Sequence, residues 1–153
     1  MKFFLVRHGE ALPSALNPDP PLSPIGREET AKVGAFLAPF TEEIDQVIHS
    51  GKKRAKETAE ILVEKAGIST KPVEREGLKP NDPVPSFVED IEFGEQNLLI
   101  VGHLPFLEKL VSYLTLQQEE ASVVNFAASS LICLEGEGSQ WRISWMISPD
   151  ALR

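Results

Sequence analysis

The sequence has 153 residues, of which 42% are hydrophobic, and a formal net charge of −8 at pH 7. A chain of this size can bury a sizeable core, and residues 1–153 are expected to form a single domain. The negative charge disfavours the phosphate contacts of nucleic-acid binding, so nucleic acid is not an expected partner. The first apolar run, Phe3 to Val6, is too short for a signal peptide or a membrane span. We therefore expect a cytoplasmic protein without membrane contact.

The first half of the chain reads as strands alternating with helices. Phe3 to Val6 is a continuous apolar run, typical of a strand covered on both faces. Ser23 followed by Pro24 is typical of a helix start, and this helix is predicted to end near Leu37. The side chains that it is expected to bury are Ile25, Val33, Phe36 and Leu37.

Four further elements follow before residue 94. We predict a strand over Gln46 to Ser50 and a helix over Lys52 to Lys65 that is closed by Gly67. A weak alternation predicts a short strand over Thr70 to Glu74, and a modest amphipathic helix is expected over Ser86 to Phe93.

The second half opens with the most convincing buried strand, Asn97 to Val101, after which Pro105 begins an apolar helix. Ser130 to Leu134 and Trp141 to Ile147 are predicted to form a hairpin around a turn at Glu135 to Ser139. Three residues of this part are expected in the core, with the two tryptophans on one face of the last strand: Cys133, Trp141 and Trp145.

This alternation predicts an α/β fold, a three-layer α/β/α sandwich with a mostly parallel central sheet and helices on both faces. Ligands of such sheets bind beyond the carboxyl ends of the strands. His8 and His103 each follow a predicted strand directly. Both histidines are therefore expected at the binding edge of the sheet.

The tripeptide Arg7-His8-Gly9 carries the main chemical signal. Imidazole is a nucleophile near neutral pH, guanidinium is a bidentate phosphate ligand, and glycine lets the backbone approach an oxyanion. The tripeptide alone is a weak indication of function. Its position after a strand and the other sequence motifs of the chain must show whether it belongs to an active site.

Several blocks in a fixed order accompany the tripeptide, and through them the chain resembles the histidine phosphatase superfamily, also called phosphoglycerate mutase-like. The blocks are Arg7-His8-Gly9-Glu10, Leu22-Ser23-Pro24-Ile25-Gly26, Ser50 with Arg54-Ala55 and Thr58-Ala59, and Val101-Gly102-His103. Within the superfamily the chain is most similar to SixA-type phosphohistidine phosphatases, short chains that lack an inserted helical lid. That likeness rests on its length and on Gly102-His103-Leu104-Pro105, Leu78-Lys79-Pro80 and Trp145-Met146-Ile147-Ser148-Pro149.

The resemblance implies that His8 is the nucleophile that becomes phosphorylated, while Arg7, Arg54 and His103 bind the phosphoryl oxygens. Phosphoryl transfer spreads negative charge over these oxygens, so catalysis is mainly positioning plus cationic stabilisation. Two guanidiniums and an imidazole supply this stabilisation, and neither a metal ion nor another cofactor is expected.

Three neighbours are candidates for supporting the site: Gly9, Glu10 and Ser50. Glu10 could instead be a polar loop residue, and Ser50 could be the start of a turn. The second ring nitrogen of His8 should be held by an acceptor such as a backbone carbonyl, and the nearby arginines should favour the neutral ring. His49 lacks such a context and is interpreted as structural.

A general acid is the feature that departs from many relatives. The nearest candidate is Glu76, whose surroundings do not match the family pattern, and Asp82 is a weaker alternative in a turn-rich stretch. A missing acid suits phosphohistidine, because its imidazole leaves readily once the ring is protonated, whereas an alkoxide needs more help.

Three functions are compatible with the sequence. The first is hydrolysis of phosphohistidine on a protein, for example a histidine-containing phosphotransfer domain. The second is hydrolysis of a small phosphorylated metabolite at the same site, with an acid. The third is a phosphate-binding module without turnover, against which the intact His8 argues.

Overall fold

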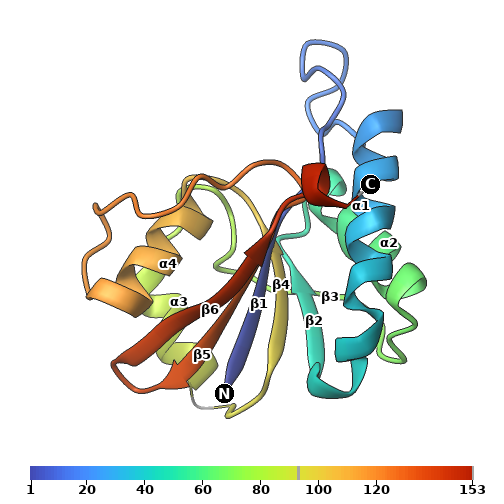
Figure 1. Cartoon of the computed structure of the whole chain (residues 1–153). Helices are drawn as coiled ribbons and strands as arrows, with labels where there is room; N and C mark the ends of the chain where they lie inside the picture. The colour runs from blue at the N-terminus through green and yellow to red at the C-terminus, as the bar shows by residue number, and fades with distance from the viewer. Residues whose placement is uncertain (93, 153) are drawn as a thin grey trace.

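The computed structural model describes residues 1–92 and 94–152, which fold around one six-stranded sheet (Figure 1). The strand order is β3-β2-β4-β1-β5-β6, with parallel pairing from β3 to β1 and antiparallel pairing of β1 with β5 and of β5 with β6. The strands are β1 (Lys2–Arg7), β2 (Gln46–His49), β3 (Val73–Glu74), β4 (Leu98–Gly102), β5 (Leu131–Glu137) and β6 (Gln140–Ile147).

Helices cover both faces of this sheet, which confirms the predicted three-layer α/β class (Figure 1). The helices are α1 (Pro24–Leu37), α2 (Lys53–Ala66), α3 (Val84–Glu92), α4 (Phe106–Leu116) and two short 3-10 helices, η1 (Ala38–Glu43) and η2 (Pro149–Ala151). Helices α1 and α2 pack on one face, and α3 and α4 pack on the other. No helix in the described ranges is both long and apolar enough to span a membrane.

Strand β1 shows why its apolar run is continuous. Phe3 and Leu5 lie in the core beneath α3 and α4, whereas Phe4 and Val6 lie in the core beneath α1 and α2. All four side chains are fully buried. Each contributes about 1.5–3 kcal/mol on burial, so this central strand holds the two helical layers together.

The predicted helix ends are confirmed at α1 and α2. The Ser23 hydroxyl accepts the backbone N–H of Gly26 at 3.0 Å, and Pro24 occupies the first turn of α1. Helix α2 ends at Gly67, whose φ of 78° suits glycine.

The burial predicted for Ile25 is wrong, because 59% of its surface is exposed. The buried stripe of α1 runs instead through positions such as Gly26, Thr30 and Val33. Position 26 is the one that meets the neighbouring loop: a Cβ there would lie 2.1 Å from the Glu10 carbonyl oxygen. Packing of this glycine against the loop turns Ile25 toward the surface.

The predicted hairpin is present, but its strands extend into the predicted turn, which shrinks to the residues between Glu137 and Gln140. Strand β3 spans two residues and is shorter than expected, and α3 begins two residues earlier than expected. The predicted last residue of that helix, Phe93, lies outside the described residues.

The two tryptophans of β6 lie on opposite faces, so the prediction that they share a face is wrong. Between Cys133 and Leu134 the register with β6 shifts. One extra residue in a strand reverses the alternation of the side chains that follow. Trp141 therefore packs beneath α3 and α4, and Trp145 packs beneath α1 and α2. Cys133 is buried as predicted, and burial raises the pKa of its thiol to about 11.

Candidate active site

Parallel pairing of β1 with β4 brings the two predicted histidines together. Arg7 pairs with Gly102 at the carboxyl ends of these strands, so His8 and His103 follow at the same edge. The ring centroids of the two histidines lie 4.9 Å apart. Helix α2 begins at this edge and adds Arg54 from its first turn.

The His8 ring is held in one tautomer by its own backbone. Its Nδ1 lies 2.7 Å from the carbonyl oxygen of Gly9. A carbonyl only accepts, so Nδ1 must carry the proton and Nε2 must carry the lone pair. Burial is the largest cause that lowers the pKa of His8 to about 4; the Gly9 carbonyl opposes this shift, and the charges of Arg54 and Arg7 add to it. The ring is therefore neutral at pH 7 and nucleophilic at Nε2.

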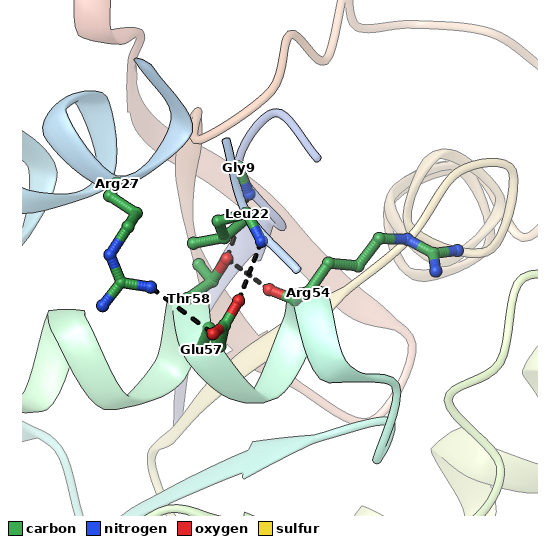
Figure 2. Close-up of polar contacts among 6 residues, drawn as sticks. All are labelled: Gly9, Leu22, Arg27, Arg54, Glu57 and Thr58. Carbon is green, nitrogen blue, oxygen red and sulfur yellow. Dashed lines mark hydrogen bonds and ion pairs between the residues drawn. The ribbon is translucent and has the colours of Figure 1, made fainter. Parts of the chain in front are cut away.

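Arg54 meets His8 from α2. Its Nε donates toward His8 Nε2 at 3.4 Å, which agrees with a lone pair on that nitrogen. One turn later the Thr58 hydroxyl donates to the Arg54 carbonyl at 2.7 Å and accepts the Gly9 N–H at 3.0 Å (Figure 2). Thr58 thus ties the backbone beside His8 to the helix turn that carries Arg54.

The loop after His8 is tied to the same helix. The Glu57 carboxylate accepts the Leu22 N–H at 2.8 Å and pairs with Arg27 of α1 at 3.4 Å (Figure 2). The Arg54 side chain extends away from Glu57 in this view (Figure 2).

Arg7 is anchored from the opposite side by the segment before β5. Its Nη1 donates to the Phe126 carbonyl at 2.8 Å, and its backbone carbonyl accepts the Ser129 N–H at 3.0 Å. Its Nε is buried and has no hydrogen-bond partner among the described residues. Part of this guanidinium is fixed, and part of its donor capacity remains for a ligand.

His103 is almost fully buried, and the Ser50 hydroxyl contacts one of its ring nitrogens. The Ser50 hydroxyl oxygen lies 2.6 Å from His103 Nε2 and accepts the Lys52 N–H at 3.3 Å. The Ser50 hydroxyl has one proton and two lone pairs, so beside the Lys52 N–H it can either donate to Nε2 or accept from it; when it donates, the proton of His103 lies on Nδ1. This Nδ1 is buried and has no partner within the described ranges. Burial lowers the pKa of His103 to about 3, with further contributions from His8, Arg54 and Lys52.

Gly9 and Glu10 serve the shape of the loop. A Cβ at Gly9 would lie 2.8 Å from the Thr30 hydroxyl and 3.0 Å from that of Ser129. Glu10 is exposed, and its carboxylate accepts the Ser23 hydroxyl at 2.9 Å. In this structure Gly9 allows close packing behind His8, and the Glu10 carboxylate holds the loop at the start of α1.

The two acid candidates lie in the segment between β3 and α3. Glu76 is exposed. The Asp82 carboxylate accepts the Lys79 N–H at 2.8 Å and so closes a local turn. Among the hydrogen bonds of the described residues, none joins either carboxylate to the four residues of the predicted site.

His49, interpreted as structural, is buried in β2, and its Nδ1 accepts the Gly51 N–H at 3.0 Å. Sequence reasoning missed two supports of the site. Thr58 follows Arg54 by one helical turn, and this spacing indicates that both side chains lie on the same face of α2. The Phe126 carbonyl has no side-chain signal at all. Within residues 1–92 and 94–152, no three His, Cys, Asp or Glu side chains gather as metal ligands.

The family assignment agrees with this geometry. The sequence model of the histidine phosphatase superfamily (branch 1) matches residues 3–80, and the chain belongs to this superfamily of phosphatases. The predicted family resemblance is thereby confirmed. A sequence comparison with curated proteins found no match.

Solved structures share the whole fold. The protein histidine phosphatase SixA, in complex with tungstate, has 24% sequence identity, a TM-score of 0.88 and coverage of 100% of both chains. A structure from Agrobacterium tumefaciens named phosphohistidine phosphatase SixA has 20% identity, a TM-score of 0.80 and 97% coverage of both. A phosphoserine phosphatase from Entamoeba histolytica, in complex with phosphoserine, has 16% identity, a TM-score of 0.76 and 99% coverage of both.

Proposed function

We propose that this chain is a phosphohistidine phosphatase, which removes the phosphoryl group from a protein histidine through a covalent phosphohistidine at His8. One observation carries the proposal. The contact of His8 Nδ1 with the Gly9 carbonyl leaves an unprotonated Nε2 beside Arg54, Arg7 and His103. A neutral imidazole among phosphate-binding groups is what nucleophilic phosphoryl transfer needs.

In the first step, His8 Nε2 attacks phosphorus, and the P–N bond to the substrate imidazole breaks. The substrate ring leaves as neutral imidazole if its other nitrogen already carries a proton. The His8 ring becomes cationic, and the Gly9 carbonyl stabilises its Nδ1–H. No proton has to move at His8 during this step.

In the second step, water attacks phosphorus and the bond to His8 Nε2 breaks. The ring retains its Nδ1 proton and leaves as the same neutral tautomer, while the phosphoryl group departs as inorganic phosphate. The proton released by water goes to solvent or to a phosphate oxygen. The Gly9 carbonyl thus serves both half-reactions with one fixed tautomer.

The charge of the transferring group would be bound by donors that lack protein partners. Arg7 Nε and His103 Nδ1 are buried nitrogens without partners among the described residues, and Nδ1 is a donor in the tautomer in which the Ser50 O–H donates to Nε2. Buried polar groups are normally hydrogen-bonded, and a phosphoryl oxygen would satisfy both. Neither step requires a metal ion, so we expect chelators to leave the rate of hydrolysis unchanged.

The preference for phosphohistidine rests on the leaving group. An alkoxide needs a positioned acid, and the two carboxylates considered for this role form no hydrogen bond with the site in the described part of the chain. The fold shared with SixA over the full length of both chains points the same way. The partner would be a phosphohistidine-bearing protein, such as a histidine-containing phosphotransfer domain.

A small-molecule phosphatase is the second candidate, because the phosphoserine phosphatase from Entamoeba histolytica has the same fold. Such an enzyme would use the same four residues together with an acid. Glu76→Ala or Asp82→Ala should then slow ester hydrolysis strongly.

A rate comparison separates the two candidates. Wild type and His8→Ala would be assayed on a phosphohistidine protein and on a panel of phosphomonoesters, with and without a metal chelator. We expect fast phosphohistidine loss that depends on His8 and poor ester turnover. Efficient turnover of one ester without hydrolysis of phosphohistidine would contradict the proposal and favour a small-molecule phosphatase.

A further inference from the structure

A hollow of about 390 Å³ lies next to the nucleophile loop and outside the phosphate-binding residues. Its lining combines carboxylates with small or apolar side chains and contains no basic residue. The lining residues are Glu10, Ile25, Glu29, Ala127, Ala128, Ser148, Pro149 and Asp150.

The hollow is joined to the active site through the backbone on two sides. Glu10 stands two residues after His8. Ala127 and Ala128 lie between Phe126, whose carbonyl binds Arg7, and Ser129, whose N–H binds the Arg7 carbonyl. Helix η2 closes the third side in contact with α1 (Figure 1). The hollow therefore adjoins the two chain segments that flank Arg7 and His8.

One exposed apolar side chain lines this hollow, and two more belong to the loop that begins at Glu10. Ile25 is 59% exposed and lines it directly. The loop from Glu10 to Leu22 projects above the same edge of the sheet (Figure 1). Near its tip Leu16 is 83% exposed, and Leu12 is 40% exposed. The base of the loop is held by the Leu12 N–H to Pro21 carbonyl bond at 2.9 Å, so these leucines stand on a fixed base.

We propose that this surface, called here the docking face and defined by the hollow with Leu12 and Leu16, binds the protein segment that carries the phosphohistidine. The inference rests on the proposed function and adds the chemistry of the partner. The phosphate site is cationic, whereas the adjoining hollow holds three carboxylates. Charge complementarity then requires an anion and a neighbouring cation in the substrate, that is, a phosphohistidine flanked by lysine or arginine. The aliphatic stem of such a residue suits Ile25 and the alanines.

Two phosphohistidine peptides test this inference, identical except for lysines or glutamates beside the phosphohistidine. For wild type we expect kcat/KM about tenfold higher on the lysine peptide at low salt, with a smaller ratio at high salt. The variant Glu29→Lys/Asp150→Lys should abolish or reverse the ratio. All enzymes should hydrolyse free phosphohistidine at rates within about twofold of each other, because neither residue belongs to the phosphate site.

The matched control is Glu89→Lys/Glu92→Lys, which changes the charge equally. These residues line a different hollow, between α3, α4 and the hairpin. This control should keep the wild-type preference. Leu16→Ser tests the apolar part, and we expect it to lower kcat/KM about threefold on both peptides and not on free phosphohistidine.

The outcomes separate this inference from the function on which it rests. Equal wild-type rates on both peptides, or a charge reversal without effect, would overturn the docking face and leave the phosphohistidine phosphatase intact. Wild type that ignores free phosphohistidine and both peptides would overturn the proposed function together with the docking face. A tenfold preference for the lysine peptide that Glu89→Lys/Glu92→Lys retains and Glu29→Lys/Asp150→Lys loses would support the docking face.

Discussion

For single residues, the environment of the two site histidines predicts their titration. Burial is the main cause that lowers the pKa of His8 to about 4 and that of His103 to about 3. Protonation of His8 would place a proton on Nε2 and remove the nucleophile, so reactivity should be lost only below about pH 4. NMR titration of the C2 protons should give both midpoints well below the ordinary 6.5. A His8 midpoint near 6.5 would contradict the neutral nucleophile.

Ser50 is expected to be a positioning residue, because its hydroxyl contacts His103 Nε2 and thereby favours one tautomer of the His103 ring. Ser50→Ala removes the hydroxyl at Nε2. We expect kcat/KM to fall about tenfold, roughly the contribution of one hydrogen bond between neutral groups. Ser50→Thr, which keeps a hydroxyl, should recover most of this loss.

The readout specific to the tautomer is the nitrogen chemical shift of His103. In wild type Nδ1 should carry the proton, and in Ser50→Ala the proton should redistribute between the two nitrogens. An unchanged tautomer together with a lower rate would assign Ser50 a merely structural role.

The sequence could nominate the four predicted site residues, because imidazole and guanidinium groups are themselves suited to nucleophilic attack and phosphate binding. The acceptor at His8 Nδ1 and the Phe126 carbonyl at Arg7 could not, because every residue has a carbonyl and only the fold selects one. Ser50 was a candidate, but its contact with His103 requires the register between β2 and β4.

Among the elements, α2 matters most for the site, and Thr58 is its link to the nucleophile loop. Thr58→Val keeps the shape of the side chain and leaves the buried Gly9 N–H without its acceptor. We expect unfolding free energy to fall by about 1–3 kcal/mol and kcat/KM to fall about tenfold or more. Urea unfolding and steady-state kinetics measure the two effects.

Thr115→Val is the matched control. Thr115 makes the same bond within its helix, to the Val111 carbonyl at 2.7 Å, but lies on α4. It should leave kcat/KM unchanged. Equal kinetic losses in both variants would contradict a specific role for Thr58.

The types and order of the elements were predictable, whereas two facing directions were not. Ile25 fits an apolar helix pattern, but Gly26 decides which face of α1 meets the loop. The face of Trp145 depends on a register shift in β5–β6 pairing that leaves no mark in the alternation of β6. The local sequence pattern gives the spacing of apolar residues in a helix or strand, whereas tertiary packing determines which face of that element is buried.

For the whole molecule, the proposed phosphate site at the sheet edge predicts stabilisation by oxyanions. A ligand that binds the folded state alone stabilises it by about 2.7 kcal/mol at a concentration one hundred times its Kd. Tungstate or phosphate should therefore raise the Tm of wild type by several degrees. Arg54→Ala should lose most of this shift, whereas Arg142→Ala, an exposed residue of β6, should keep it. Equal shifts in both variants would place the anion elsewhere.

Rapid quenching shows whether His8 carries the phosphoryl group during turnover. Wild type would be mixed with labelled phosphohistidine substrate, quenched in base within milliseconds, digested and analysed by mass spectrometry. We predict a phosphoryl group on the peptide that contains His8, stable in base and labile in acid, and none in His8→Ala. A label on the peptide that contains His103, or turnover without any labelled enzyme, would contradict the account.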